Sequence, residues 1–94
     1  MRDLDLTSLR LFVAVCEARN IARAAEQQAL VGSAISKRLA ALEDTVGTPL
    51  LVRRRRGVEP TPAGVTLLEH AREMLANQAR IERDMAAYAA GVRG

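Results

Sequence analysis

Aromatic residues and cysteine are scarce in this chain. Phe12 and Tyr88 are the only aromatic side chains, and Cys16 is the only cysteine. A single cysteine excludes an internal disulfide and a cysteine-based zinc cluster, and it favours a reducing compartment. Alanine and leucine are abundant instead, which favours close packing between helices over a sheet-rich sandwich or barrel.

Long apolar runs are also missing. No stretch approaches the roughly 20 residues that cross a bilayer, and Asp3 and Asp5 stand where a signal peptide has its apolar core. We therefore expect a cytoplasmic protein that is neither exported nor embedded in a membrane. At 94 residues, the chain has room for one small domain with a modest core, plus an appendage.

The excess positive charge lies in the middle of the chain. The formal net charge is only +3, and each flank has one more acidic than basic residue. Residues 19–56, by contrast, carry eight basic side chains (Arg19, Arg23, Lys37, Arg38 and residues 53–56) against three acidic ones (Glu26, Glu43 and Asp44). Such a distribution favours a polyanionic partner.

Hydrophobic periodicity predicts two helices in the first 30 residues. The first follows an Asp5 cap, and its apolar positions recur at three- and four-residue steps: Leu6, Leu9, Phe12, Val13 and Cys16. Asn20 can cap a shorter helix that ends near Gln28. Its inward residues Ile21, Ala24 and Ala25 include small alanines that let another helix approach closely.

A third helix follows after residues 29–32. Its apolar positions are Ile35, Leu39, Leu42 and Val46, and Gly47 and Pro49 stop it. The opposite face carries Ser36, Lys37, Arg38 and Glu43. This helix therefore has one buried face and one polar, mostly basic face.

A basic hairpin is predicted next. Residues 50–52 favour a short extended segment, the four arginines 53–56 continue it, and Gly57 supplies the permissive backbone for a tight reversal. The chain then returns through Val58 and Glu59. We expect a two-stranded wing with arginines along it.

Thr61 and Pro62 start a final helix that meets no breaker before Gly91. At roughly 30 residues, or about 45 Å, it is too long for so small a core to cover, so most of it must project. Its stripe alternates steps of four and three, the period of a helix that lies along another helix. The stripe consists of Leu67, Ala71, Met74, Gln78, Ile81, Met85 and Tyr88, widened by Leu68 and Leu75. Pairing of two copies is the simplest way to cover it.

The second and third helices, joined by a short turn, have the layout of a helix-turn-helix whose second member enters the DNA major groove. An arginine-rich wing beside that helix can contact phosphates or reach the adjacent minor groove. The predicted fold is mainly α: a winged helix-turn-helix of three helices and a short two-stranded wing at residues 1–60, then a linker and dimerisation helix at residues 61–90.

Several stretches are specific enough to compare with known families. They are Leu6, Leu9, Phe12 and Val15, then Arg23-Ala24-Ala25-Glu26, Ala34-Ile35-Ser36-Lys37-Arg38-Leu39, Leu42-Glu43, Val46-Gly47, Pro49-Leu50, Arg53 and Thr61-Pro62-Ala63-Gly64. In this order they resemble the N-terminal region of the LysR-type transcriptional regulators, across essentially the whole chain.

The resemblance implies a dimer whose linker helices pair antiparallel and which binds imperfect palindromes in double-stranded DNA upstream of regulated genes. It also implies a larger C-terminal domain that binds a small-molecule effector. Residues 91–94 would then be the junction to that absent domain, and the chain a DNA-binding fragment. The alternative is a naturally short form.

The chain departs from the resemblance where the third helix begins. Relatives usually open it with Ser-Gln followed by proline or serine, whereas this chain has Val31, Gly32 and Ser33. Gly32 has no side chain to read a base, and Ser33 or Gly32 must cap the helix. Gln28 stands where leucine is preferred, and Leu51 where phenylalanine is preferred, which loosens local packing. Direct readout should therefore depend more heavily on Ser33, Ser36, Lys37 and Arg38.

The predicted functional residues form two groups. The DNA-binding group is Arg23, Gly32, Ser33, Ser36, Lys37, Arg38, Arg53, Arg54, Arg55 and Arg56. The dimerisation group is Leu67, Ala71, Met74, Leu75, Gln78, Ile81, Met85 and Tyr88. The alternatives are an ordinary solvated helix face for Lys37 and Arg38, a solubilising hairpin tip for the arginine run, and a surface ion pair with Glu26 for Arg23.

The remaining chemically distinctive residues carry no predicted site. His70 is isolated on a helix and should be a surface residue, while Cys16 should be a core residue and not a redox sensor. We expect no enzyme, metal or cofactor, because the sequence has no nucleophile with a base, no metal cluster and no phosphate loop. The alternative to DNA binding is a basic dimerisation module that binds RNA or an acidic protein.

Overall fold

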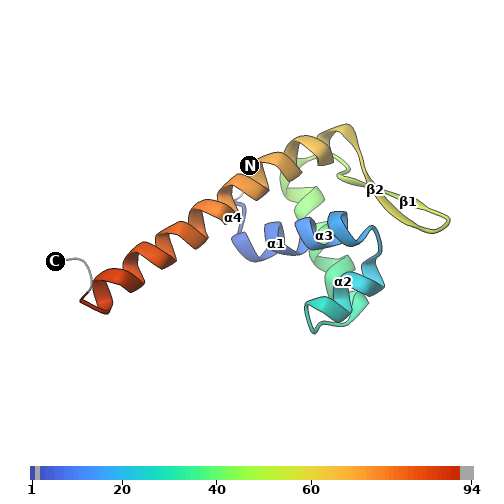
Figure 1. The fold of residues 1–94 in the computed structure, drawn as a ribbon. Helices are drawn as coiled ribbons and strands as arrows, with labels where there is room; N and C mark the ends of the chain where they lie inside the picture. The colour runs from blue at the N-terminus through green and yellow to red at the C-terminus, as the bar shows by residue number, and fades with distance from the viewer. Residues whose placement is uncertain (2, 92–94) are drawn as a thin grey trace.

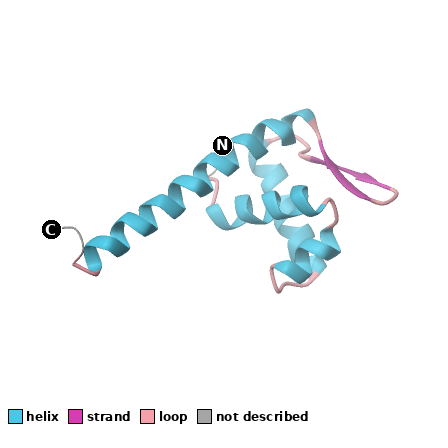
Figure 2. Cartoon of the chain, viewed as in Figure 1, coloured by secondary structure: helices cyan, strands magenta, loops and turns pink. Residues whose placement is uncertain are grey.

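The computed structural model describes residues 1 and 3–91, which form four helices and one hairpin (Figure 1). The elements in chain order are α1 (Leu6–Ala18), α2 (Ile21–Gln27), α3 (Gly32–Val46), β1 (Leu51–Arg54), β2 (Gly57–Pro60) and α4 (Pro62–Ala89). Figure 2 shows helix through most of the chain, with the hairpin projecting at one end and α4 at the other. The predicted winged helix-turn-helix with a long final helix is confirmed.

The first two helices begin at the predicted caps. The Asp5 carboxylate accepts hydrogen bonds from the Ser8 backbone N–H at 2.7 Å and from the Ser8 hydroxyl at 2.9 Å. Asn20 likewise accepts from the backbone N–H of Arg23 at 2.9 Å. Each bond satisfies an N–H group that has no partner inside its own helix, which fixes where the helix starts.

The core joins one apolar face of α1 to those of α2 and α3. Its largest fully buried side chains are Phe12, Leu9, Ile35, Leu50 and Val15. Ala24 and Ala25 bring α2 close to both neighbours, because small side chains allow a short distance between helix axes. The core therefore holds α2 and α3 in a fixed relation to each other.

The cap of α3 differs from the prediction. Val31 is the N-cap residue and makes no side-chain cap bond, so neither Ser33 nor Gly32 has that role. The helix starts on backbone bonds alone, from the N–H groups of Ala34 and Ile35 to the Val31 carbonyl at 3.1 and 3.3 Å. Valine has no side-chain acceptor to satisfy the remaining free N–H groups.

The hairpin also reverses one step earlier than expected. Arg53 pairs with Val58 and Arg54 with Gly57, so Arg55 and Arg56 form the turn and Gly57 begins β2. Gly57 is required for another reason, since its φ is +148° and an added Cβ would overlap the carbonyl oxygen of Arg19. The same carbonyl accepts the Val58 N–H at 3.1 Å, so the wing rests directly on the turn between α1 and α2.

Helix α4 begins where predicted and crosses α1 before it projects (Figure 1). Thr61 caps it by accepting the Gly64 N–H at 3.0 Å, with Pro62 at the first helical position. Arg72 bonds Glu17 at 3.3 Å, and Arg10 bonds Gln78 at 3.0 Å. These contacts join α1 to the part of α4 that ends at Gln78, and the helix then extends away from the core.

In the single chain, α1 covers part of the predicted pairing stripe. Ala71 is 0% exposed in the single chain, in a cluster with Leu9 and Val13 of α1. Leu67 and Leu75 are partly buried against the same cluster. The first half of the stripe therefore covers the chain's own α1, because α1 lies alongside it. The side chains of the stripe that stay between 43% and 60% exposed are Met74, Ile81, Met85 and Tyr88. The junction predicted at residues 91–94 lies, apart from Gly91, outside the described residues.

Candidate nucleic-acid interface

The outward face of α3 is narrower than the sequence suggested. Ile35, Leu39 and Leu42 are buried on one side of the helix. Ser33 and Lys37 lie one turn apart on the opposite side, and both are exposed. In the described part of the chain, no carboxylate pairs with the Lys37 ammonium. Lys37 is therefore available to an external acceptor.

Ser36 and Arg38 flank that outward face on opposite sides. Ser36 is half-buried and turns toward the wing, where it lines a hollow together with Arg53. The Arg38 guanidinium leans toward α1 and lies 3.8 Å from the Asp5 carboxylate. The pKa of Asp5 is lowered, first by the Ser8 backbone N–H and also by the charge of Arg38. The four side chains predicted to read bases, those of Ser33, Ser36, Lys37 and Arg38, therefore do not share one face of α3.

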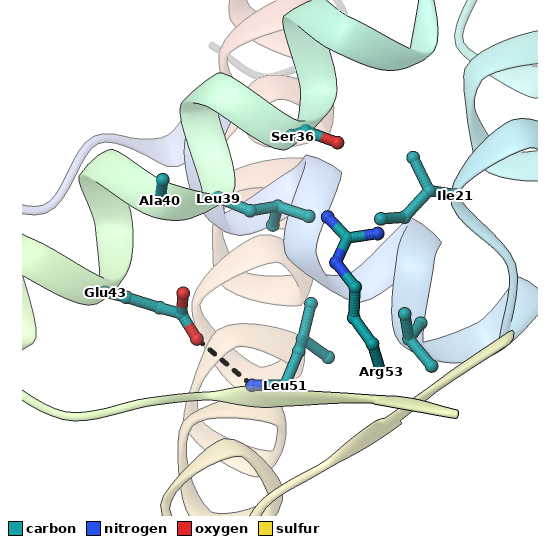
Figure 3. A pocket seen from close by; sticks show the side chains of 8 residues that line it. Ile21, Ser36, Leu39, Ala40, Glu43, Leu51 and Arg53 are labelled. Atoms are coloured by element: carbon teal, nitrogen blue, oxygen red, sulfur yellow. Dashed lines mark hydrogen bonds between the residues drawn. The ribbon is translucent and has the colours of Figure 1, made fainter. Parts of the chain in front are cut away.

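The four arginines of the wing point to different surroundings. Arg53 reaches from β1 toward Ser36 of α3 and Ile21 of α2 (Figure 3). Arg54 pairs with Glu59 on the other strand at 3.2 Å. Arg55 and Arg56 are exposed at the turn, and neither has an ion pair within residues 3–91. Three of the four charges are therefore free to meet an anionic ligand.

A hollow of about 100 Å³ separates α3 from the wing. Its wall combines residues from α2, α3 and both strands, including Ile21, Ser36, Glu43, Arg53 and Val58. The position of Arg53 in this wall places a positive charge directly beside α3 (Figure 3). A basic side chain of the wing therefore lies against the third helix.

Arg23 is exposed on the first turn of α2. The ion pair with Glu26 that the sequence left open is not among those formed by the described residues. Its guanidinium therefore adds to the free positive charge of the helix-turn-helix.

Glu43 is a residue whose role the sequence analysis missed. Its carboxylate accepts the backbone N–H groups of Leu50 at 2.7 Å and Leu51 at 3.2 Å. The bond to Leu51 is drawn in Figure 3. It thus ties the last turn of α3 to the first residues of the wing and does not face outward. The available signal was its position, because an acid near a helix C-terminus opposes the helix dipole unless a local partner compensates.

Cys16 and His70 take the positions predicted for them. Cys16 belongs to the buried core, and burial raises the pKa of its thiol to about 11, while His70 is exposed on α4. Within the described residues, no group of three or more histidine, cysteine or acidic side chains is arranged to hold a metal ion. No helix of this part of the chain is long and apolar enough to cross a membrane.

Residues 6–65 match the family model described as "Bacterial regulatory helix-turn-helix protein, lysR family". The chain belongs to this family. The match covers α1, α2, α3, the wing and the first turn of α4. The resemblance seen in the sequence is therefore confirmed.

Two curated regulatory proteins are similar to the chain in sequence. The chain is 35% identical over 89 residues to a small neutral protease regulatory protein of Streptomyces coelicolor, covering 95% of this chain and 27% of that protein. It is 45% identical over 73 residues to the transcriptional regulator BudR of Raoultella terrigena, covering 78% and 25%. The chain thus spans about a quarter of the length of these curated relatives.

Solved structures of LysR-family DNA-binding domains superpose closely. The CbnR DBD–DNA complex matches with a TM-score of 0.85 and 37% identity, over 92% of this chain and 99% of that one. The BenM DBD in complex with catB site 1 DNA matches with a TM-score of 0.91 and 30% identity, over 96% and 97%. The likeness extends over α4 as well as the winged domain.

Proposed function

We propose that this LysR-family chain is the DNA-binding part of a bacterial transcriptional regulator and binds an imperfect palindrome in double-stranded DNA as a dimer. The observation that carries the proposal is the set of basic side chains on α3 and the adjacent wing, Lys37, Arg53, Arg55 and Arg56, whose charges have no acidic partner among the described residues. The CbnR and BenM relatives, crystallised with DNA, support it. We propose that the protein acts in the cytoplasm and that it has no enzymatic activity.

In this proposal α3 enters the major groove and presents Ser33 and Lys37 to base edges. Arg53, Arg55 and Arg56 contact phosphates or the adjacent minor groove, and Arg23 contributes a phosphate contact from α2. Phosphate contacts position the protein without reading sequence, whereas contacts to base edges specify the site. Ser36 and Arg38 have flanking roles, since one faces the wing and the other pairs with Asp5.

The exposed apolar side chains of α4 support the proposed dimer. Met74, Ile81, Met85 and Tyr88 form an apolar strip on a helix that projects beyond the core. Such a strip is a liability on a monomer, and pairing with the same strip of a second copy covers it. Ile81→Glu should give monomers by analytical ultracentrifugation. Ala79→Glu places the same charge on the opposite face of α4 and should leave the dimer intact; equal effects of the two would refute this pairing face.

DNA binding can be tested by fluorescence anisotropy over a range of salt concentrations. Arg55→Ala should weaken all duplexes about equally and reduce the slope of log affinity against log salt by about one. Lys37→Ala should instead reduce the preference for a selected palindrome over random duplex. Arg83→Ala removes an equal charge from the far end of α4 and serves as the control.

Two outcomes would contradict the proposal. If the affinity for duplex DNA does not fall as the salt concentration rises, the protein does not make the proposed phosphate contacts. Tighter binding to a single-stranded or duplex RNA of the same sequence would favour the alternative, a basic module that binds RNA.

A further inference from the structure

The turn between α2 and α3 exposes two large apolar side chains. Leu30 is 43% and Val31 is 67% exposed, and we call this pair the apolar tip. Val31 costs the isolated domain stability twice, because it leaves apolar surface in water and because it is a poor N-cap residue. A serine at this position would remove both costs. The structure of the single chain therefore provides no reason for the apolar tip.

The apolar tip is held rigidly in place. The N–H of Leu30 bonds the Ala25 carbonyl at 2.9 Å, and the N–H of Ala29 bonds the Glu26 carbonyl at 3.2 Å. These two bonds form a Schellman motif at the end of α2, with Ala29 in the left-handed conformation at φ 55°. Because the backbone is fixed on both sides of the turn, the tip meets a ligand with little loss of conformational entropy.

Gly32 leaves the space beside the tip open. A Cβ added at Gly32 would meet only Ile21 Cγ2, at an ordinary contact distance of 3.9 Å. Its φ is not positive, so the backbone does not require glycine. The missing side chain lets a ligand surface come close to the backbone at the start of α3 and makes Val31 the most prominent side chain there.

Apolar groups are rare in the DNA major groove, and the thymine 5-methyl group is the one that a base edge offers there. A recognition helix contacts base edges with the residues at its N-terminal end, which is where the apolar tip lies. Ser33 and Lys37 are the exposed polar side chains on the outward face of the first two turns of α3, so few hydrogen bonds are available for reading bases.

We propose that Val31, with Leu30 beside it, determines specificity by packing against thymine 5-methyl groups in each half-site. The inference rests on the proposed DNA binding, and it adds which chemical feature of the base sequence is read. Lys37 and Arg23 have no ion pair among the described residues. Their positive charges favour a polyanionic partner for this part of the domain over an apolar protein surface. Contact with methyl groups replaces the hydrogen bonds that a glycine at position 32 cannot make.

The test uses the tightest duplex recovered by the 94-residue chain from a random-sequence pool. Each thymidine is replaced in turn by deoxyuridine, which removes only the 5-methyl group, and the dissociation constant is measured by fluorescence anisotropy. We expect one or two positions per half-site at which the change weakens binding about fourfold, corresponding to about 0.8 kcal/mol. Val31→Ser changes both protomers of the dimer and removes these contacts from both half-sites, so it should weaken binding by at least about 16-fold and should no longer respond to deoxyuridine at those positions.

Val31→Ser and the control Val65→Ser separate a loss of methyl contacts from a loss of folding. Serine at position 31 can cap α3, so Val31→Ser is expected to fold. Val65→Ser makes the same change at an exposed residue of α4 and should respond to deoxyuridine as the wild type does. The inference is overturned if the selected site lacks thymine, or if wild type and Val31→Ser respond equally at every position. A pool without any enriched duplex would overturn the proposed function as well.

Discussion

Removing the carboxylate of Glu43 should loosen the wing from α3. This side chain accepts two backbone N–H groups, those of Leu50 at 2.7 Å and Leu51 at 3.2 Å. Glu43→Ala leaves both donors without their acceptor at the point where the chain enters β1. Glu43→Gln keeps an acceptor oxygen in place but removes its charge, so the two variants separate geometry from charge.

The expected loss follows from the two bonds. A hydrogen bond to a charged group contributes about 1.5–3 kcal/mol, and the two donors are only partly buried, so water recovers part of that energy. Removing an acid from the last turn of α3 returns about 0.5 kcal/mol through the helix dipole. We therefore expect Glu43→Ala to lower the free energy of unfolding by about 2 kcal/mol and Glu43→Gln by about 1 kcal/mol. For a chain of this size, 2 kcal/mol lowers Tm by roughly 8–16 °C.

Thermal and urea unfolding followed by far-UV circular dichroism, at one protein concentration, would measure these losses. Asp44→Ala is the matched control, because Asp44 is the neighbouring acid on the same turn and is exposed. Its removal changes the charge near the helix end equally but breaks no bond to the wing, so stability should stay constant or rise slightly. If Glu43→Ala is no more destabilising than Asp44→Ala, the assigned link between α3 and the wing is wrong.

Three further predictions concern single residues. Ala29→Gly should raise Tm by roughly 4–8 °C, because glycine adopts the left-handed conformation at φ 55° without the strain of about 1 kcal/mol that a Cβ imposes; an unchanged or lower Tm would contradict this. Cys16, buried and with its pKa raised to about 11, should react with a thiol reagent near pH 8 far more slowly in native protein than in urea, and equal rates would show that the core is open. The lowered pKa of Asp5 means that its contribution is present above its unfolded-state pKa, for which 3.8 is the reference, and is lost as pH falls through the folded-state value. Urea unfolding at a series of acidic pH values should therefore show a flatter pH dependence for Asp5→Asn than for wild type, and identical profiles would count against the cap.

The order and type of elements could be predicted from the sequence, because they depend on local patterns. The apolar spacing from Leu6 to Cys16 defines a helix wherever it lies, and Asp5, Asn20 and Thr61 act as caps through bonds to residues three positions away. The Thr61-Pro62 start and the concentration of arginines in the wing are equally local. These features, with the family motifs, were sufficient for the fold class and the family.

The direction in which side chains face depended on the tertiary structure. Periodicity placed Ala71 and Ile81 on one stripe of α4. In the structure, α1 covers Ala71 and leaves Ile81 exposed. The sequence of α4 alone does not show how far α1 extends along it. Arg38 and Glu43 appeared as outward partners of Lys37 until Asp5 and the Leu50 and Leu51 N–H groups were placed beside them. Gly57 looked like a turn residue, yet it is needed because the carbonyl of Arg19, 38 positions earlier in the chain, lies against it. Local hydrogen bonds and periodicity thus determined the elements of this protein, while contacts between residues distant in sequence decided which of their charged and apolar groups remain free to meet a partner.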